Sequence, residues 1–317
     1  MYKNKKISVI MPAYNEELLI IASLESIPDY IDHVYAIDDC SQDLTYELIQ
    51  AYAKKNPHVE LIRHNVNSGV GAAIVTGYKK SLEDGVDIAV VMAGDNQMDP
   101  KYIPSLIDPL IEGKADYTKG NRLTSLKTMK GMSPLRMFGN FILSLITKAS
   151  SGYWDISDPQ NGYTAIKTEV LTNINLDQIW PSYGYCNDLL TKLNVGEYLV
   201  KDIDIPARYG QEKSKIKLGR YIKNLSKLLI RNFFWRIHSK YIKRKFSLIA
   251  ILYDGGICLT IFGLALEIIT IASEVFNLRI INLLNYAIYP ITMGIIFVLL
   301  GILLDMRQNE KEQRLKY

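Results

Sequence analysis

The sequence predicts an α/β domain built on a mostly parallel sheet, followed by a basic amphipathic helix and two transmembrane helices. Through the first hundred residues, apolar strand-like runs alternate with helical segments, and this βαβα alternation is typical of a parallel sheet with helices on both faces. Near the C-terminus, two apolar segments are long enough to cross a bilayer. The 317 residues, of which 48 % are hydrophobic and 22 % charged, exclude a disordered chain.

Four strands and three helices are expected in order along the first part of the chain. The strands are short apolar runs at residues 7–11, 33–37, 59–63 and 87–92. The helices follow them at residues 16–27, 43–55 and 70–82. Ligands of such sheets bind outside the carboxyl ends of the strands. The residues expected to carry function therefore lie at 12–16, 38–43 and 94–97.

A basic segment follows the predicted sheet. Residues 213–245 contain twelve Lys or Arg and no acidic residue, which leaves the rest of the chain net negative. Apolar side chains recur at helical spacing from Leu218 to Leu229, and basic ones fill the other face. This pattern indicates an amphipathic helix in the headgroup layer of a membrane. A nucleic-acid-binding stripe is the alternative for any basic cluster, but the position directly before a membrane span argues against it.

Two segments are expected to span the membrane as helices. They cover residues 248–273 and 287–304, and neither has a polar face at helical spacing. Two buried core helices of a soluble protein are the alternative. Asp254 and Glu267 interrupt the first segment, and acids in a membrane segment usually face protein or a cavity.

The flanking charges predict the orientation of this hairpin. Basic residues stand on both outer flanks, whereas the connecting loop at 274–285 carries only Arg279 and Glu274. The positive-inside rule therefore places the α/β domain and both termini in the cytoplasm, at the plasma membrane of a prokaryote. No apolar leader precedes the first strand, so no signal peptide is expected.

Four regions are expected along the chain. They are the α/β domain at 1–212, the basic segment at 213–245, the hairpin at 246–304 and a cytoplasmic tail at 305–317. Cys40, Cys186 and Cys258 show no metal-binding or disulfide spacing, so we expect free thiols in a reducing compartment.

The strand-end residues include oxygen ligands that suit a divalent cation. Asp95 and Gln97 are separated by one residue, so both side chains point the same way in an extended segment. Mg²⁺ is usually held by one or two carboxylates together with substrate phosphates. A single loop acid is more often a turn former or helix cap, and Asp43 and Asp99 fit that simpler role.

Four ordered motifs resemble those of the family 2 glycosyltransferases with a GT-A fold. They are Pro12-Ala13-Tyr14-Asn15-Glu16 after the first strand, Asp38-Asp39-Cys40-Ser41-Gln42-Asp43, Asn67-Ser68-Gly69-Val70-Gly71, and Met92-Ala93-Gly94-Asp95-Asn96-Gln97. The resemblance covers residues 7–210 and implies a Rossmann-like GT-A domain that takes a GDP- or UDP-hexose. It implies Mg²⁺ or Mn²⁺ on Asp95 and Gln97. The donor contacts that it implies are Pro12, Ala13, Tyr14, Asn15, Glu16, Asp38, Asp39, Gly69 and Asp95.

Later motifs are similar to those of the polyprenyl-phosphate glycosyltransferases within this family. The segments are Gly120-Asn121-Arg122, Ser133-Pro134-Leu135-Arg136 and Asp158-Pro159-Gln160-Asn161-Gly162-Tyr163. Lys215 resembles a family position near the donor phosphates. One departure is Ala93, which replaces the first Asp of the Asp-x-Asp-x-Gln metal motif and leaves one carboxylate fewer for the ion.

A dolichyl or undecaprenyl phosphate acceptor needs cations rather than a general base. Its second pKa is about 6, so it is already an anionic nucleophile at neutral pH. Arg122 and Arg136 offer guanidinium groups for it, and Asn140 is assigned to the same acceptor site; two solvated surface arginines are the simpler reading. Asp158 either orients sugar hydroxyls or caps a turn. The expected catalytic residues are Asp95, Arg122, Arg136 and Asp158, and the resemblance implies inversion at the anomeric carbon.

Two other functions stay open at this point. A transferase that extends a glycan on a sugar hydroxyl needs a general base; the family's Gln-x-x-Arg-Trp motif is absent, and Asp188 is the nearest equivalent of the base. A non-catalytic nucleotide-sugar sensor is the second alternative, and Ala93 alone favours it. A membrane is an expected partner, nucleic acid is not, and a homo-oligomer is left open.

Overall fold

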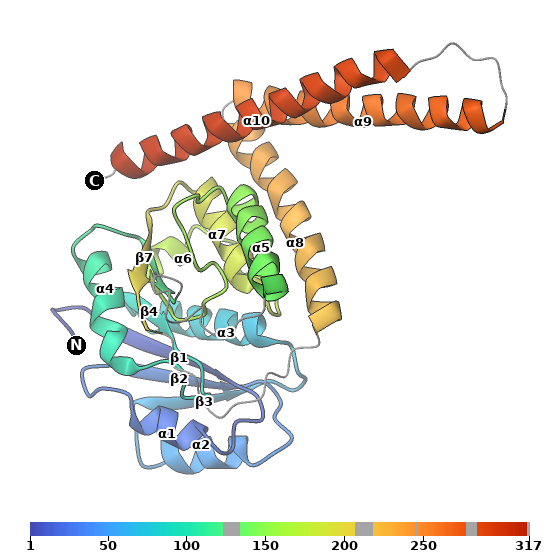
Figure 1. The fold of residues 1–317 in the computed structure, drawn as a ribbon. Coiled ribbons are helices and arrows are strands. Elements are labelled where there is room, and N and C mark those ends of the chain that lie inside the picture. The colour runs from blue at the N-terminus through green and yellow to red at the C-terminus, as the bar shows by residue number, and fades with distance from the viewer. Residues whose placement is uncertain (123–133, 207–217, 245, 277–283, 316–317) are drawn as a thin grey trace. The chain divides into compact units, whose positions relative to one another are not determined.

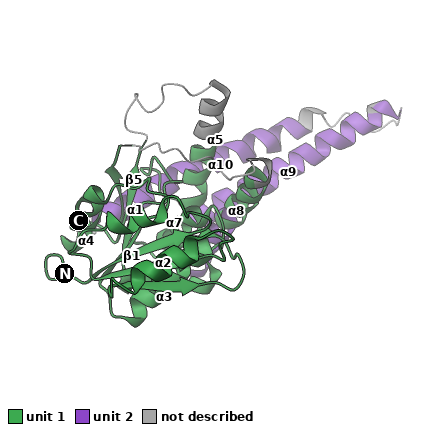
Figure 2. Cartoon of the chain, turned by 90° about the horizontal axis from the view of Figure 1, so that it is seen from below, with its two compact units in different colours: residues 1–232, 317 green, residues 233–316 purple. Residues whose placement is uncertain are grey.

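The computed structural model describes residues 1–122, 134–206, 218–244, 246–276 and 284–315, with side chains outside 134–141, 218–220, 274 and 284–286. The chain forms two compact units, residues 1–232 and residues 233–316, which Figure 2 shows in green and purple. The boundary at Asn232 lies within the basic segment that the sequence placed between the α/β domain and the hairpin.

A seven-stranded sheet organises the first unit (Figure 1). Its strand order is β3-β2-β1-β4-β6-β5-β7. The pairs that involve β6 are antiparallel, and the other pairs are parallel. The predicted α/β class with a mostly parallel sheet is confirmed. The strands are β1 (Ile7–Ala13), β2 (His33–Asp38), β3 (Val59–Arg63), β4 (Ile88–Val91), β5 (Tyr117–Asn121), β6 (Thr164–Lys167) and β7 (Val200–Asp204).

Helices cover both faces of this sheet and complete two apolar cores. One core includes side chains of α1 (Ile20–Glu25), α2 (Thr45–Ala53) and α4 (Ile103–Ile111). The other includes side chains of α3 (Val70–Glu83), α6 (Thr168–Leu171) and α7 (Tyr185–Val195). Alternate residues of β1 face the two sides, because Ile7 and Val9 enter the first core and Ile10 the second. The short helices η1 (Pro100–Tyr102) and η2 (Leu176–Gln178) and the long α5 (Pro134–Ser151) complete the unit.

The first helix begins later than the sequence predicted. We expected it from residue 16, and α1 begins at Ile20. The Glu16 N–H donates to Thr45 Oγ1 (2.8 Å), and the Glu17 N–H donates to Asp43 Oδ2 (3.2 Å). Because these bonds hold residues 16 and 17 against the loop before α2, their amides are used outside the helix. The other strands and helices predicted in the first hundred residues agree with the structure within two residues at each end. The second apolar helix is longer than predicted, because α10 (Leu284–Leu315) continues through the expected tail at 305–317.

α8 (Leu218–His238) is the predicted basic helix, and part of its apolar face, Leu225, Leu228 and Leu229, is buried in protein. The sequence placed that face in the lipid headgroup layer. In the first unit, α8 instead forms a small core with α5 and the segment before α7, made by Leu225, Leu228, Leu229, Leu143, Trp180 and Tyr221. The exposed side chains of α8 include the basic Lys223 and Lys227 beside Ile222 and Ile230. A position in the headgroup layer stays a prediction, and this mixed face is the surface available for it.

The second unit contains the two apolar helices, α9 (Leu248–Val275) and α10 (Leu284–Leu315), after a π-helical segment, η3 (Ser239–Arg244). Both helices are long and apolar enough to cross a membrane, over Leu248–Ser273 and Ala287–Leu315. They pack closely at glycines, because a Cβ on Gly294 would lie 2.3 Å from Thr260 Oγ1 and 2.6 Å from the Gly256 carbonyl oxygen. Small residues of this kind are typical of helix contacts within membranes.

A buried polar cluster joins α10 to the residues that precede α9. Arg236 and Asp305 are fully buried, with Nη1–Oδ1 and Nη2–Oδ2 distances of 3.0 and 2.7 Å. The hydroxyl of Tyr241 donates to Asp305 Oδ1 (2.5 Å), and Lys240 pairs with Glu312 (2.7 Å). Burial alone would lower the pKa of Arg236, but the adjacent carboxylate raises it. The ion pair therefore stays charged inside this unit.

Candidate active site

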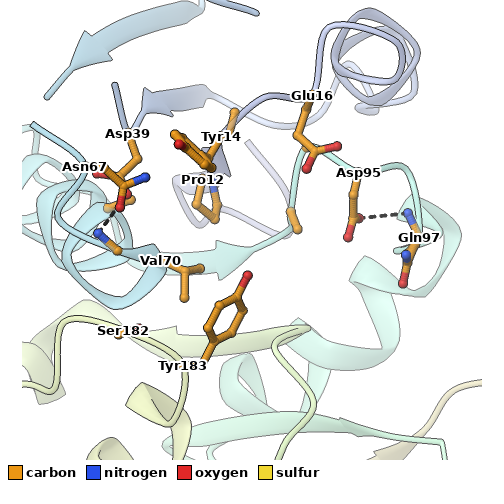
Figure 3. Close-up of a pocket in the computed structure, with 15 residues that line it drawn as sticks. Pro12, Tyr14, Glu16, Asp39, Asn67, Val70, Asp95, Gln97, Ser182 and Tyr183 are labelled. Atoms are coloured by element: carbon orange, nitrogen blue, oxygen red, sulfur yellow. Dashed lines mark hydrogen bonds between the residues drawn. The ribbon is translucent and has the colours of Figure 1, made fainter. Parts of the chain in front are cut away.

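A cavity of about 570 Å³ lies at the carboxyl ends of β1, β2 and β4 (Figure 3). Its size falls within the range of small-molecule sites. The four motifs found in the sequence all contribute to it, as the predicted ligand edge requires. Its lining residues are Pro12, Ala13, Tyr14, Glu16, Asp39, Asn67, Gly69, Val70, Ala73, Ala93, Gly94, Asp95, Gln97, Ser182 and Tyr183.

The turn after β1 is shaped by Asn15. Its φ of 55° lies in the left-handed region, which Asn tolerates better than most residues. The Asn15 N–H donates to Ser41 Oγ (3.0 Å), and its Oδ1 accepts from the Gln42 N–H (2.8 Å). These bonds tie the turn to the loop after β2, and Tyr14 and Glu16 line the cavity. Asn15, a predicted donor contact, lies outside the described lining and holds the shape of the turn.

Asp39 organises the end of the cavity next to the start of α3. Its Oδ1 lies 2.7 Å from His64 Nδ1 and accepts from the Ser68 N–H (2.9 Å), while its Oδ2 accepts from the Gly69 N–H (2.7 Å). His64 Nε2 lies 2.9 Å from Thr76 Oγ1 of α3. Asp39 therefore fixes the loop at the start of α3. Sequence reasoning missed His64 because it stands in no recognisable spacing; its one signal is its place directly after β3.

Asp38, the other acidic residue predicted to contact the sugar donor, has partners inside the protein. It is fully buried, accepts from the Ser41 N–H (3.2 Å) and forms an ion pair with Arg63 (3.3 Å). Asp38 lies outside the described lining of the cavity. The two neighbouring acids of the motif thus have different roles. Asp39 lines the cavity, and Asp38 stabilises the loop that carries Asp39.

Asp95 and Gln97 line the end of the cavity beyond β4, together with Glu16. The Gln97 N–H donates to Asp95 Oδ1 (3.1 Å), and the intervening Asn96 has a φ of 57°. Figure 3 shows the Glu16 and Asp95 side chains on the same side of the cavity. Within the described residues, no group of three or more His, Cys, Asp or Glu is placed to hold an ion alone. The donor set of carboxylate and amide oxygens suits Mg²⁺ or Mn²⁺ when substrate phosphates supply further ligands.

The charge of the cavity is negative. Glu16, Asp39 and Asp95 contribute carboxylates, and no Lys or Arg occurs among the described lining residues. A diphosphate would add negative charge to this space, and like charges in a partly buried site repel strongly. A bound cation removes that repulsion, so the electrostatics of the described lining fit a metal-assisted diphosphate site.

Residues 180–183 form a wall of the cavity that sequence reasoning missed. Ser182 and Tyr183 belong to the lining, and the Ala72 N–H at the start of α3 donates to the Pro181 carbonyl (2.9 Å). Gly69 and Gly71 permit this approach, because a Cβ on Gly71 would lie 2.2 Å from the Trp180 carbonyl oxygen. The signal in the sequence was the glycine pair at the start of a helix, which marks a close backbone contact without identifying its partner.

Arg122 and Asp158, two of the predicted catalytic residues, form an ion pair. Arg122 Nε lies 2.8 Å from Asp158 Oδ2, and its Nη2 lies 3.3 Å from Oδ1. The carboxylate is buried, whereas the arginine side chain is 43 % exposed. Next to it, the Ser157 N–H donates to Asp202 of β7 (2.7 Å), whose pKa burial raises to about 6. The predicted side-chain roles of Arg136, Asn140 and Lys215 lie outside the described residues.

Asp188, the base of the alternative hydroxyl-acceptor reading, is buried among partners. Its Oδ2 accepts from the Trp180 N–H (2.9 Å) and pairs with Lys192, and its Oδ1 pairs with Arg231 (3.2 Å). Both of its oxygens are engaged by protein groups and the residue is 1 % exposed, whereas a general base must lie within hydrogen-bond reach of the proton that it removes. Its position supports a structural role.

A mostly parallel sheet with a carboxylate-lined cavity at the ends of β1, β2 and β4 defines a GT-A glycosyltransferase domain. The chain belongs to glycosyl transferase family 2, whose sequence profile matches residues 8–174. The resemblance found in the sequence is therefore confirmed, and the protein is a glycosyltransferase. Ser182 and Tyr183 of the cavity wall lie beyond the matched residues.

Known relatives of this chain include archaeal enzymes named for lipid phosphate acceptors. It is 33 % identical over 218 residues to the UDP-N-acetylglucosamine–dolichyl-phosphate N-acetylglucosaminyltransferase of Methanococcus voltae, which covers 63 % of this chain and 86 % of the relative. It is 29 % identical over 245 residues to the dolichol-phosphate mannosyltransferase of Pyrococcus furiosus, which covers 71 % and 64 %.

A solved structure with the same fold is the glucosyl-3-phosphoglycerate synthase of Mycobacterium tuberculosis, crystallised with Mn²⁺, UDP-glucose and phosphoglyceric acid. The TM-score is 0.54 at 21 % identity, over 74 % of this chain and 80 % of that one. At this identity the likeness concerns the fold alone.

Proposed function

We propose that this protein transfers a hexose or N-acetylhexosamine from a nucleoside diphosphate sugar to a polyprenyl phosphate in the membrane, with inversion at the anomeric carbon. The observation that carries the proposal is the carboxylate-lined cavity at the ends of β1, β2 and β4, in a chain whose relatives are named for dolichyl phosphate acceptors. The two helices of membrane-spanning length fit an acceptor that resides in a bilayer.

The cavity supports a donor that carries a diphosphate. Asp39 and Asn67 lie at one end of the lining, and Asp95, Gln97 and Glu16 lie at the other (Figure 3). Asp95 and Gln97 would hold Mg²⁺ or Mn²⁺, and the ion would neutralise the diphosphate as it leaves. Ala93 stands where the family motif has a further acid, so the ion depends on substrate oxygens for the rest of its ligands.

The acceptor chemistry explains why no general base is needed. An oxygen of the lipid phosphate attacks the anomeric carbon, the bond from that carbon to the diphosphate breaks, and the nucleoside diphosphate leaves with the electron pair. The attacking phosphate is already ionised at neutral pH, so no proton has to be removed. Arg122, half-exposed and oriented by Asp158, supplies a cation for such a phosphate.

The membrane arrangement belongs to the same proposal. We place the α/β domain and both termini in the cytoplasm, where nucleotide sugars are made, and the loop between α9 and α10 outside. A single cysteine introduced into that loop of a cysteine-free variant should react with an impermeant maleimide in intact cells. Reaction only after permeabilisation would contradict this orientation.

The direct test uses membranes that contain the full chain. They are incubated with polyprenyl phosphate and a panel of UDP- and GDP-linked hexoses and N-acetylhexosamines, and the lipids are analysed by mass spectrometry. We expect polyprenyl phosphate to gain one sugar with one of these donors, and Asp95→Asn membranes serve as the inactive control. A sugar added only to a pre-existing lipid-linked glycan would overturn the acceptor assignment.

A further inference from the structure

We propose that α8 positions residues 180–183 as the second wall of the donor cavity, with Tyr183 contacting the donor and Arg231 acting as a positioning residue. This inference rests on the proposed nucleotide-sugar donor. It adds to that function a part of the chain that lies beyond the residues matched by the family profile.

Tyr183 is placed to touch whatever fills the cavity. Its side chain is 49 % exposed, and Figure 3 shows it on the side of the cavity opposite Tyr14. Pro12 and Val70 lie between the two rings in that view. Two aromatic faces across a cavity of this size suit a flat or amphipathic ligand part, such as a base or a sugar face. The acidic end at Asp95 is left for the diphosphate and its cation.

The wall is held from one side by α3. The Ala72 N–H donates to the Pro181 carbonyl, and Gly69 and Gly71 leave no room for a Cβ next to residues 180–182. This contact fixes the distance between the wall and the loop that Asp39 binds. A shift of residues 180–183 would therefore change the width of the donor cavity directly.

From the other side, α8 holds the same segment at three points. Arg231 pairs with Asp188, which in turn accepts from the Trp180 N–H. The Arg231 guanidinium also lies 5.5 Å from the centroid of the Trp180 ring. Tyr221 meets the Tyr183 ring edge to face, with centroids 6.4 Å apart. Between these points, Leu225 and Leu228 approach Gly184, where a Cβ would lie 3.2 and 3.0 Å from their methyl groups. Gly184 also has a φ of +106°, so the turn after the wall favours glycine, and the missing side chain lets Leu225 and Leu228 of α8 approach it.

α8 lies directly before the apolar hairpin in the chain. α8 runs to His238, and the apolar α9 begins at Leu248. The helix that holds the donor wall is therefore the same helix that leads into the apolar hairpin. Its exposed Lys227 has the same charge as Arg231 and lies one turn earlier on α8, which provides a matched control.

The test compares Arg231→Gln with Lys227→Gln in the full-length protein in detergent. Both changes remove one positive charge from α8, so an effect of membrane charge alone would be equal in the two variants. Asp188 keeps Lys192 in Arg231→Gln, so the fold is retained. We expect Arg231→Gln to raise the donor KM about tenfold with kcat within about twofold, and Lys227→Gln to match the wild type. Arg231→Lys should recover part of the loss, since it restores the charge but not the planar group on Trp180.

A readout that needs no substrate decides the structural part separately. Hydrogen exchange is followed in peptides that contain the Ala72 amide and residues 180–185. Faster exchange there in Arg231→Gln than in Lys227→Gln is the expected result, and equal exchange would overturn the positioning role even if transfer is impaired.

Titration with UDP and with GDP, each with Mn²⁺, then decides the donor contact. Tyr183→Ala should weaken nucleotide binding about tenfold and Tyr183→Phe should not, since the ring face makes the contact. Equal affinities for wild type and Tyr183→Ala would refute that contact. Binding of neither nucleotide by the wild type would instead refute the proposed donor class, and the exchange experiment would still decide the role of α8.

Discussion

Removal of the Arg122 side chain tests the acceptor assignment most directly. Arg122 follows the end of β5, and two of its guanidinium nitrogens face the Asp158 carboxylate at 2.8 and 3.3 Å. Because its side chain is 43 % exposed, a phosphate group can still reach the guanidinium. The arginine therefore combines a fixed orientation with access to a ligand, which is what a phosphate-binding cation requires.

Two effects of Arg122→Ala have to be separated. Hydrogen bonds to charged groups contribute about 1.5–3 kcal/mol, which corresponds to a loss of roughly tenfold to a hundredfold in acceptor use. The substitution also leaves the buried Asp158 without this partner, at a cost of about 1–3 kcal/mol in unfolding free energy. Solvent around the half-exposed guanidinium favours the lower part of that range. The double variant Arg122→Ala/Asp158→Asn removes the unpaired charge and should recover stability without recovering lipid transfer.

The assay measures two rates in each variant: donor hydrolysis without lipid, and transfer to polyprenyl phosphate. We expect hydrolysis near the wild-type rate and a selective loss of transfer in both the single and the double variant. Arg122→Lys should restore only part of the transfer, since a point charge lacks the bidentate fork. An equal loss of both rates would mean that Arg122 serves the donor or the fold, and transfer that returns with stability in the double variant would refute phosphate binding.

Three further outcomes are expected. Asp95→Asn should abolish most transfer even at saturating Mn²⁺ while Gln97→Ala retains more, as radiolabelled product will measure; near wild-type turnover of Asp95→Asn would move the ion elsewhere. Burial raises the pKa of Asp202 to about 6, against an ordinary 3.8. The contribution of the protonated Asp202 to the free energy of unfolding is therefore complete below the lower value and is lost as pH rises through the higher one. As the pH rises from about 3.8 to about 6, Asp202→Asn should therefore gain up to about 3 kcal/mol of unfolding free energy relative to the wild type; a difference that does not change with pH would contradict this. Gly294→Leu should separate α9 from α10 and lower the thermal midpoint, whereas Gly255→Leu, with open space at its Cβ, should not.

The sequence could predict the first half of the sheet because its information is local. β1 to β4 are apolar runs bounded by turn residues, and each ligand motif lies directly after its strand. β5, β6 and β7 were not predicted. β5 reads Tyr-Thr-Lys-Gly-Asn and becomes a strand through pairing with β6 and β7. That pairing depends on residues far apart in the chain, which tertiary context decides rather than propensity.

In the candidate site too, residues in local motifs could be predicted, and residues brought in by tertiary contacts could not. Asp39 and Asp95 were found from their motifs, and both line the cavity. The partners of Asp39 could not be found this way, because His64 meets it only after β2 and β3 pair side by side. The wall at residues 180–183 was missed for the same reason: it reaches the cavity only through the approach to Gly69 and Gly71.

The buried ion pairs of the second unit change how its charges should be read. Arg236 and Lys240 are two of the basic residues that flank the hairpin, from which its orientation was predicted. In the structure both are buried: Arg236 is held by Asp305, and Lys240 by Glu312. Burial lowers the pKa of Lys240, and the Glu312 carboxylate opposes that shift. Removing one partner of such a pair leaves an uncompensated buried charge. Arg236 and Lys240 therefore act mainly in joining η3 and the end of α8 to α10. We expect the exposed Lys243 and Arg244, rather than these two, to contact anionic lipid headgroups.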